Sequence, residues 1–147
     1  MEQRLYLDVC TLCRPFDDQA AMRIRLETNA YYLILQSIRD QLWQMMVSPV
    51  HFQEVQAIPD PQERYEVLEV LESYGHPITP LETIRQRSEQ LHSLGFGVAD
   101  AAHVAFAESG ADVFVSCDDR LLQKCQREHV AVAAMTPVAF CVREDLQ

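Results

Sequence analysis

Short apolar segments alternate with longer helical patterns along this chain, and that alternation constrains the fold more than any other feature. The apolar segments are rich in β-branched and aromatic residues, as buried strands are. Five of them are predicted as strands, over residues 5–9, 43–47, 77–79, 113–117 and 130–135. Because a helix separates each strand from the next, the strands should lie parallel, with helices on both faces. We therefore predict an α/β fold of three layers around a five-stranded parallel sheet.

The helices between these strands begin and end at recognisable residues. The longest is predicted over residues 19–42, with Asp17 or Asp18 as its cap. Asp60 and Pro61 start a helix that should end at Gly75. The other helices are predicted over residues 49–56, 80–94, 98–108, 119–128 and from residue 137 onward. The length of 147 residues suits one domain, so we predict a single domain over residues 1–147.

Composition narrows the possible functions. No stretch of the sequence contains the roughly 20 apolar residues that a membrane-spanning helix needs. The five cysteines are an odd number in a chain with a full-sized core, which favours free thiols in the reducing cytoplasm. A formal net charge of −10 argues against a nucleic-acid binder, although metal ions held by some of the acids would cancel part of that charge.

Four acidic residues occupy places where the pattern asks for an apolar side chain or ends an element. Asp8 ends the first strand, Glu54 follows the second, and Asp118 follows the fourth, while Asp100 opens the helix 98–108. In an open parallel sheet, ligands bind beyond the carboxyl ends of the strands. Clustered carboxylates there are tolerable if Mg²⁺ or Mn²⁺ lies among their oxygens. Taken singly, each acid is equally well interpreted as a helix cap or a solvated loop residue.

Four stretches, in order along essentially the whole chain, resemble the PIN-domain ribonucleases, a family that includes the VapC-type toxins of bacterial toxin–antitoxin pairs. These stretches are Leu7-Asp8, Ser48 through Glu54, Val98 through Ala105, and Ser116 through Leu121. The resemblance implies an endoribonuclease that hydrolyses RNA with Mg²⁺ or Mn²⁺, and an antitoxin protein as a partner. The catalytic residues and metal ligands that it implies are Asp8, Glu54, Asp100 and Asp118. It also implies that Ser116 is a polar neighbour of Asp118.

One departure from the family supports an alternative function. Many relatives have a Thr-Asn pair after the first aspartate, where this chain has Val9 and Cys10. The alternative is therefore a catalytically inactive PIN-like module that acts through protein contacts. A phosphoryl-receiver domain is a weaker candidate, because no aspartate follows the middle strand and the only lysine, Lys124, lies inside a predicted helix.

Several further residues allow both a functional and a structural interpretation. Asp119 is a candidate neighbour of the metal ligands or an alternative ligand, but a helix N-cap is favoured. Glu27 is expected to form a surface ion pair with Arg23, four residues earlier. His103 follows Asp100 by one helical turn, and a hydrogen-bonded core histidine is favoured over a catalytic one. The pair Cys10 and Cys13 has the spacing of a redox motif, which we regard as the weaker interpretation.

Partner contacts can also be predicted. Arg14 and Arg120 are the best candidates for RNA phosphate contacts, because each is close in sequence to a proposed ligand. The apolar bulk of the long helix and second strand suggests a homodimer seam or an antitoxin groove, although a helix buried on two sides explains it equally well. The residues concerned are Tyr31, Tyr32, Leu35, Trp43, Met45 and Met46.

Overall fold

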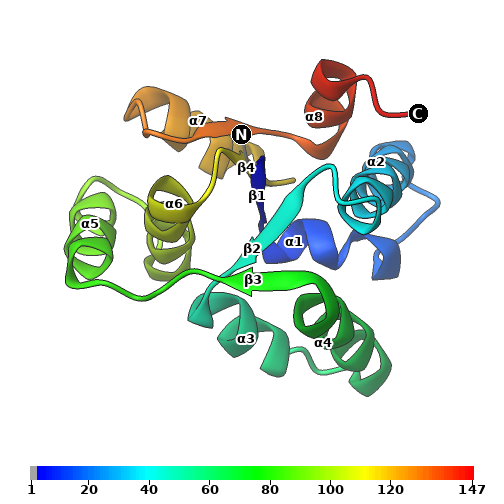
Figure 1. Cartoon of the computed structure of the whole chain (residues 1–147), viewed down its shortest axis with the longest axis horizontal. Helices are drawn as coiled ribbons and strands as arrows, with labels where there is room; N and C mark the ends of the chain where they lie inside the picture. The colour runs from blue at the N-terminus through cyan, green and yellow to red at the C-terminus, as the bar shows by residue number, and fades with distance from the viewer. Residues whose placement is uncertain (1–2) are drawn as a thin grey trace.

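The predicted sheet is confirmed by the computed structural model, which describes residues 3–147. The first two residues of the predicted 1–147 domain therefore lie outside the described part of the chain. The strands are β1 (Arg4–Leu7), β2 (Gln44–Val47), β3 (Gly75–Pro77), β4 (Val113–Val115) and β5 (Ala133–Met135). They form one sheet in the order β3-β2-β1-β4-β5, and every neighbouring pair is parallel (Figure 1).

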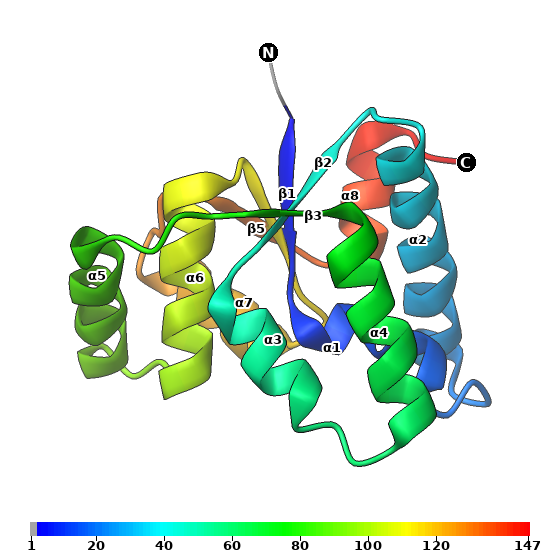
Figure 2. The same cartoon turned by 60° about the horizontal axis from the view of Figure 1, so that its bottom comes forward.

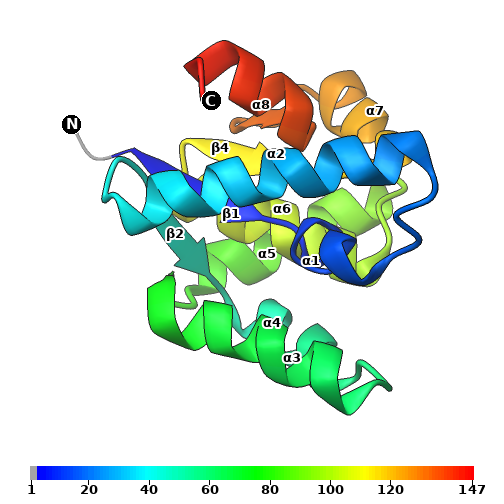
Figure 3. The same ribbon diagram turned by 90° about the vertical axis from the view of Figure 1, so that its right-hand side faces the viewer.

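Helices cover both faces of this sheet, as Figure 2 shows. One face carries the helices α1 (Val9–Leu12), α2 (Met22–Arg39), α3 (Pro49–Gln56), α4 (Pro61–Tyr74) and α8 (Pro137–Glu144). The other face carries α5 (Glu82–Ser93), α6 (Val98–Gly110) and α7 (Asp119–Arg127). A short 3₁₀ helix, η1 (Arg14–Phe16), leads into α2. Figure 3 shows α2 lying between α8 and α4. The three-layer α/β architecture is thus confirmed.

Alternation of side chains along the central strands divides the core into two parts. Leu5 and Leu7 of β1 pack on the face covered by α2, whereas Tyr6 points to the face covered by α6. On β4, Phe114 points to the same face as Tyr6, and Val113 and Val115 point to the face covered by α2. All residues of these two strands except Arg4 are buried, as expected for a parallel sheet covered on both faces.

Several predicted boundaries were wrong at the ends of the elements. The first strand stops at Leu7, and Asp8 instead caps the unpredicted helix α1. The long helix starts at Met22, after Ala21, so neither Asp17 nor Asp18 is its cap. Asp18 accepts a hydrogen bond from the backbone of Ala20, which is in the turn before the helix. These short polar side chains stabilise local turns, and the predicted helix is therefore shortened at its start.

The third strand lies two residues earlier than predicted. Helix α4 ends at Gly75, as expected, and β3 begins at that same residue. A Cβ atom on Gly75 would lie 2.3 Å from the Leu71 carbonyl oxygen and 2.7 Å from a Val47 methyl carbon. Only glycine fits this tight transition from α4 into the sheet. The strand ends at Pro77, which is tolerated because β3 is at the edge of the sheet.

The residues proposed for a homodimer seam mostly belong to the core. Four of the six are buried, namely Tyr31, Leu35, Trp43 and Met45. Only Tyr32 is largely exposed, with 53% of its surface accessible. These four positions belong to the core, and the homodimer remains a prediction that they do not support.

No helix within residues 3–147 combines the length and the apolar character that crossing a membrane requires.

Candidate functional site

The four predicted acidic residues come from four different elements that meet at the carboxyl edge of the sheet. Asp8 follows β1, and Glu54 lies on α3, which follows β2. Asp118 stands between β4 and α7, and Asp100 lies in the first turn of α6. In Figure 2, α1, α3 and the start of α6 lie near the end of the sheet at which β1 finishes. We call these four residues the acid site.

Asp8 is the most firmly held member of the acid site. Its side chain is buried, and its Oδ1 accepts a hydrogen bond of 2.8 Å from the backbone N–H of Val9 at the start of α1. Its Oδ2 accepts a bond of 2.9 Å from the hydroxyl of Ser116. Ser116 Oγ also accepts the backbone N–H of Asp118, at 3.1 Å. The buried serine therefore joins the ends of β1 and β4 and fixes the orientation of the Asp8 carboxylate.

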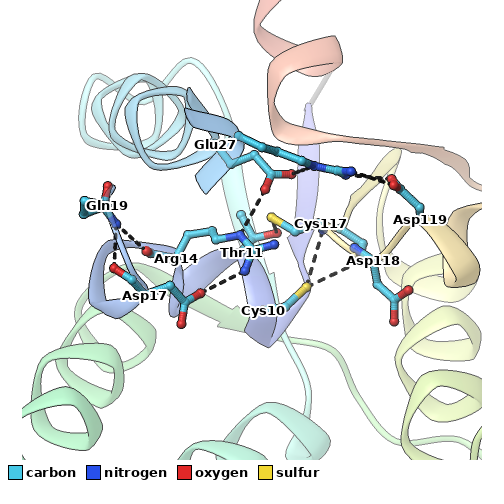
Figure 4. A network of polar contacts seen from close by, with 11 residues as sticks. Cys10, Thr11, Arg14, Asp17, Gln19, Glu27, Cys117, Asp118 and Asp119 are labelled. Carbon is cyan, nitrogen blue, oxygen red and sulfur yellow. Dashed lines mark hydrogen bonds and ion pairs between the residues drawn. The ribbon is translucent and has the colours of Figure 1, made fainter. Parts of the chain in front are cut away.

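Asp118 caps α7, and this corrects the interpretation of its neighbour. The Oδ1 of Asp118 accepts the backbone N–H groups of Arg120 and Leu121, at 3.0 and 3.2 Å. Asp119 was favoured as the N-cap, but it is the first helical residue and its carboxylate pairs with Arg23 through two bonds of 2.7 Å. Figure 4 shows Asp118 and Asp119 directed to different sides of the chain. The contacts of Asp119 thus lie away from the acid site.

Asp100 is partly buried and lies near the other acids of the acid site. Burial raises the pKa of its carboxyl, and the negative charges of Asp8 and Asp118 raise it further, with a smaller contribution from Glu54. The nearby His103 acts in the opposite direction. The four carboxylates are therefore close enough for their charges to interact, and no arginine or lysine in the described part of the chain forms an ion pair with any of them.

His103 is a hydrogen-bonded core histidine, as predicted, and it contacts two members of the acid site. It is buried, as expected of a core histidine, but its Nε2 bonds the carboxylate of Glu54 and lies 4.0 Å from Asp8 Oδ1. The side chain of Glu54 is 38% exposed, so the contact joins the core to the surface of the site. The signal available in the sequence was the spacing of His103 three residues after Asp100, on the same face of α6.

The donors of the acid site suit a hard divalent cation in their chemistry. Four carboxylates that form no ion pair with an arginine or lysine of residues 3–147 provide oxygen ligands and negative charge, which Mg²⁺ or Mn²⁺ would neutralise. However, within residues 3–147 no three His, Cys, Asp or Glu side chains are grouped closely enough to form a ready-made metal site. The residues therefore fit the cation by type and charge, and they would have to adjust around it.

A second acidic group lies beside the first and is balanced by arginine. Glu27 is buried rather than exposed as predicted, and it forms ion pairs with Arg14 at 3.0 Å and Arg23 at 3.6 Å. Arg14 also pairs with Asp17 at 2.9 Å, and Arg23 pairs with Asp119. Figure 4 shows this network, which we call the arginine-paired group. It explains why the long helix α2 can bury a glutamate.

The two arginines predicted to bind RNA differ in whether their side chains are already paired with acids. The guanidinium of Arg14 is engaged by Glu27 and Asp17, so its contacts do not support a role in holding RNA phosphates. Arg120 is exposed next to Asp118, and its side chain forms no hydrogen bond or ion pair with the described residues. Arg120 is therefore the better placed of the two for contact with a substrate.

Cys10 contacts the residues that hold Asp8. Its sulfur lies 3.5 Å from Ser116 Oγ and accepts the backbone N–H of Cys117 at 3.4 Å (Figure 4). Its contact with the Cys117 thiol and its burial both raise the pKa of the Cys10 thiol. Burial also raises the pKa of Cys13, to about 12. All five cysteines are free, and thiols with raised pKa values are poorly suited to redox exchange.

Comparison with solved structures identifies the fold. The chain resembles the crystal structure of FitAcB from Neisseria gonorrhoeae, with 17% sequence identity, a TM-score of 0.53, and coverage of 90% of this chain and 97% of the other. It also resembles the structure of FitAB bound to IR36 DNA fragment, with 16% identity, a TM-score of 0.56, and coverage of 91% and 95%. No protein-family model matches the sequence, and no curated protein matches it significantly.

The parallel sheet, its helices and the similarity to these two structures show that the chain has a PIN-like fold. The predicted resemblance is confirmed at the level of the fold by the whole-length similarity to FitAcB and FitAB. At 16–17% identity these similarities carry no further than the fold.

Proposed function

We propose that this protein is an endoribonuclease that hydrolyses RNA phosphodiesters with Mg²⁺ or Mn²⁺. The observation that carries the proposal is the acid site, in which carboxylates from four separate elements interact at the carboxyl edge of a parallel sheet and form no ion pair with an arginine or lysine of residues 3–147. Structural acids in the same region are balanced by Arg14 and Arg23. A carboxyl group whose pKa is raised by burial and by neighbouring negative charges, as at Asp100, is typical of functional sites.

The residues of the chain have distinct parts in this proposal. Asp8, fixed by Val9 and Ser116, together with Glu54, Asp100 and Asp118, would hold the cation. When bound, the cation would supply an activated water and neutralise charge at the phosphodiester. Arg120, exposed beside Asp118, would contact a phosphate of the RNA, because guanidinium groups bind phosphate oxygens through paired hydrogen bonds.

Asparagine substitutions at Asp8 and Asp100 test this proposal. Each removes one negative charge and keeps the shape of the side chain. Cleavage of single-stranded RNA with Mn²⁺ should fall by at least about a hundredfold, as expected when metal ligation is impaired. Asp40→Asn is the matched control, because Asp40 is exposed at the opposite edge of the sheet and should leave the rate unchanged. Undiminished cleavage by folded Asp8→Asn and Asp100→Asn proteins would refute the proposed role.

An inactive PIN-like interaction module is the second candidate, and two observations favour it. Both oxygens of Asp8 already accept hydrogen bonds, and no ready-made group of metal ligands is present within residues 3–147. Calorimetry with Mn²⁺ separates the two candidates. Binding that is lost in Asp100→Asn supports the nuclease, whereas no measurable binding to the unmodified protein supports the module.

A protein partner also belongs to the proposal. The similar FitAB structure is bound to a DNA fragment, whereas this chain has a formal net charge of −10 and is a poor DNA ligand by itself. We therefore propose a basic antitoxin as the partner, with the present chain as the toxin. The five free thiols agree with a location in the reducing cytoplasm, which remains part of this proposal.

A further inference from the structure

A series of hydrogen-bonded side chains connects the centre of the sheet to the acid site. Tyr6, on the central strand β1, has its hydroxyl 2.7 Å from Ser48 Oγ and 2.6 Å from His103 Nδ1. The other ring nitrogen of His103 bonds the carboxylate of Glu54. Tyr6 and His103 are at most 1% exposed, whereas the side chain of Glu54 is 38% exposed. The series therefore leads from the rigid core to a carboxylate at the surface.

The chemistry of these groups fixes the imidazole ring at both nitrogens. An ionised carboxylate can only accept, so Nε2 of His103 must carry a proton and donate it to Glu54. Burial raises the pKa of Tyr6 well above its usual value, so the phenol keeps its proton. Its oxygen can either donate to Nδ1 or accept from it, with Ser48 completing the arrangement. The ring is thus held whichever protonation state Nδ1 has.

The orientation of the Glu54 carboxylate depends on a single hydrogen-bond partner, the ring of His103, whereas Asp8 and Asp118 each have two partners. Asp8 is held by Val9 and Ser116, and Asp118 by two backbone N–H groups of α7. Glu54 has a longer and partly exposed side chain, and within residues 3–147 its only hydrogen-bond partner is His103. Without this contact, the rotatable bonds of Glu54 would let its carboxylate turn away into solvent.

We propose that His103 is a positioning residue of the acid site: it holds the Glu54 carboxylate on the side of Asp8, and Tyr6 holds the ring of His103. That this positioning serves metal binding rests on the proposed nuclease function. The positioning of Glu54 by His103 can itself be tested without metal or RNA. Interactions that orient metal ligands in this way are commonly worth 10- to 100-fold in metal affinity, an order-of-magnitude range.

The first experiment uses the metal-free protein. In ¹⁵N-labelled protein, the buried Nε2–H of His103 should give a slowly exchanging, downfield NMR resonance because it is bound to a carboxylate. The resonance should disappear or move upfield in Glu54→Ala, which affects a half-exposed side chain and should fold. The control Glu69→Ala, at an exposed position of α4, should leave it unchanged. Absence of the resonance, or its persistence in Glu54→Ala, would overturn the proposal.

The second experiment measures the dissociation constant of Mn²⁺ by calorimetry. His103→Ala should weaken binding about tenfold, Tyr6→Phe about threefold, and His103→Gln, whose amide can donate in place of Nε2, should restore most of the affinity. The double variant of His103→Ala and Glu54→Ala should bind no more weakly than Glu54→Ala alone, because both changes remove one interaction.

Two results of the calorimetry would contradict the positioning role. They are an unchanged affinity in His103→Ala, and a further tenfold loss when His103→Ala is added to Glu54→Ala. If the unmodified protein binds no Mn²⁺, the nuclease proposal fails, and the metal-free resonance alone decides whether His103 positions Glu54. If His103→Ala does not fold, His103→Gln and Tyr6→Phe provide the comparison.

Discussion

Two groups of acidic side chains lie close together around the ends of β1 and β4, and they differ in how their charge is balanced. In the arginine-paired group, Glu27 is more deeply buried than any residue of the acid site, yet it has Arg14 and Arg23 as partners. In the acid site, His103 is the only basic side chain of residues 3–147 that contacts the carboxylates. The comparison teaches that burial alone does not mark a functional acid. The two groups differ in whether an arginine pairs with the acids, and this difference can be tested directly.

The largest expected loss of stability follows from removing an acid of the arginine-paired group. Glu27→Ala would leave Arg14 with a half-buried charge and only Asp17 as a partner, so the free energy of unfolding should fall by about 3 kcal/mol. Urea unfolding followed by circular dichroism measures this change. Glu66→Ala, on the surface of α4, should change stability by less than about 0.5 kcal/mol. An equally small effect at Glu27 would remove the distinction between the two groups.

A smaller loss of stability is expected when the buried Ser116, which bonds Asp8, is changed. Ser116→Ala removes the donor to Asp8 and the acceptor for the Asp118 backbone, which should cost about 2 kcal/mol because polar groups are left unsatisfied. Ser37→Ala is the matched control, since its buried hydroxyl bonds only a carbonyl of its own helix and should cost less than about 1 kcal/mol. Equal losses in the two variants would mean that Ser116 does not hold the acid site.

The smallest expected effect is on how the free energy of unfolding depends on pH, and it has opposite signs in the two groups. The pKa of Asp100 is raised above its ordinary value of 3.8, so the ionised carboxylate destabilises the fold at neutral pH, and this cost disappears as the pH falls through the raised pKa. Asp100→Asn should therefore be more stable than the parent at pH 7, by less than about 1 kcal/mol because solvent screens this half-buried group.

Asp119 should show the reverse behaviour, because the hydrogen bond from Arg23 lowers the pKa of its carboxyl. Its pairing stabilises the fold above the unfolded pKa and is lost as the pH falls through the lowered value. Unfolding free energies of the parent, Asp100→Asn and Asp119→Asn between pH 3 and pH 8 compare the two. If Asp100→Asn is less stable than the parent at pH 7, the carboxylate has a stabilising partner and the acid site is not uncompensated.

The parts of the fold that sequence reasoning predicted well depend on local chemistry. The helix α3 was predicted with its observed bounds, Pro49–Gln56, and Pro61 and Pro137 start their helices as expected. The order of strands and helices followed from periodicity, and it was enough to place the four acids at one edge of the sheet. The predicted Asp60 cap is also present, since its side chain accepts the backbone N–H of Gln62.

The errors have a common cause in contacts between residues far apart in the sequence. Glu27 was expected at the surface because Arg23 is its helical neighbour, but Arg14 from the preceding turn provides the second cation that lets it be buried. His103 was correctly predicted as a hydrogen-bonded core residue, but its partner Glu54 lies 49 residues away, and nothing in the local pattern indicates that pairing. Likewise, Asp119 was misinterpreted because its partner, Arg23, lies 96 residues earlier.

The edges of the sheet have a consequence for how this protein behaves at high concentration. The outer strands β3 and β5 contain three residues each, and β3 ends in Pro77, which has no amide hydrogen to offer. An incoming polypeptide would thus find little backbone with which to extend the sheet. The short edge strands therefore disfavour fibril-like growth by addition of strands to the sheet.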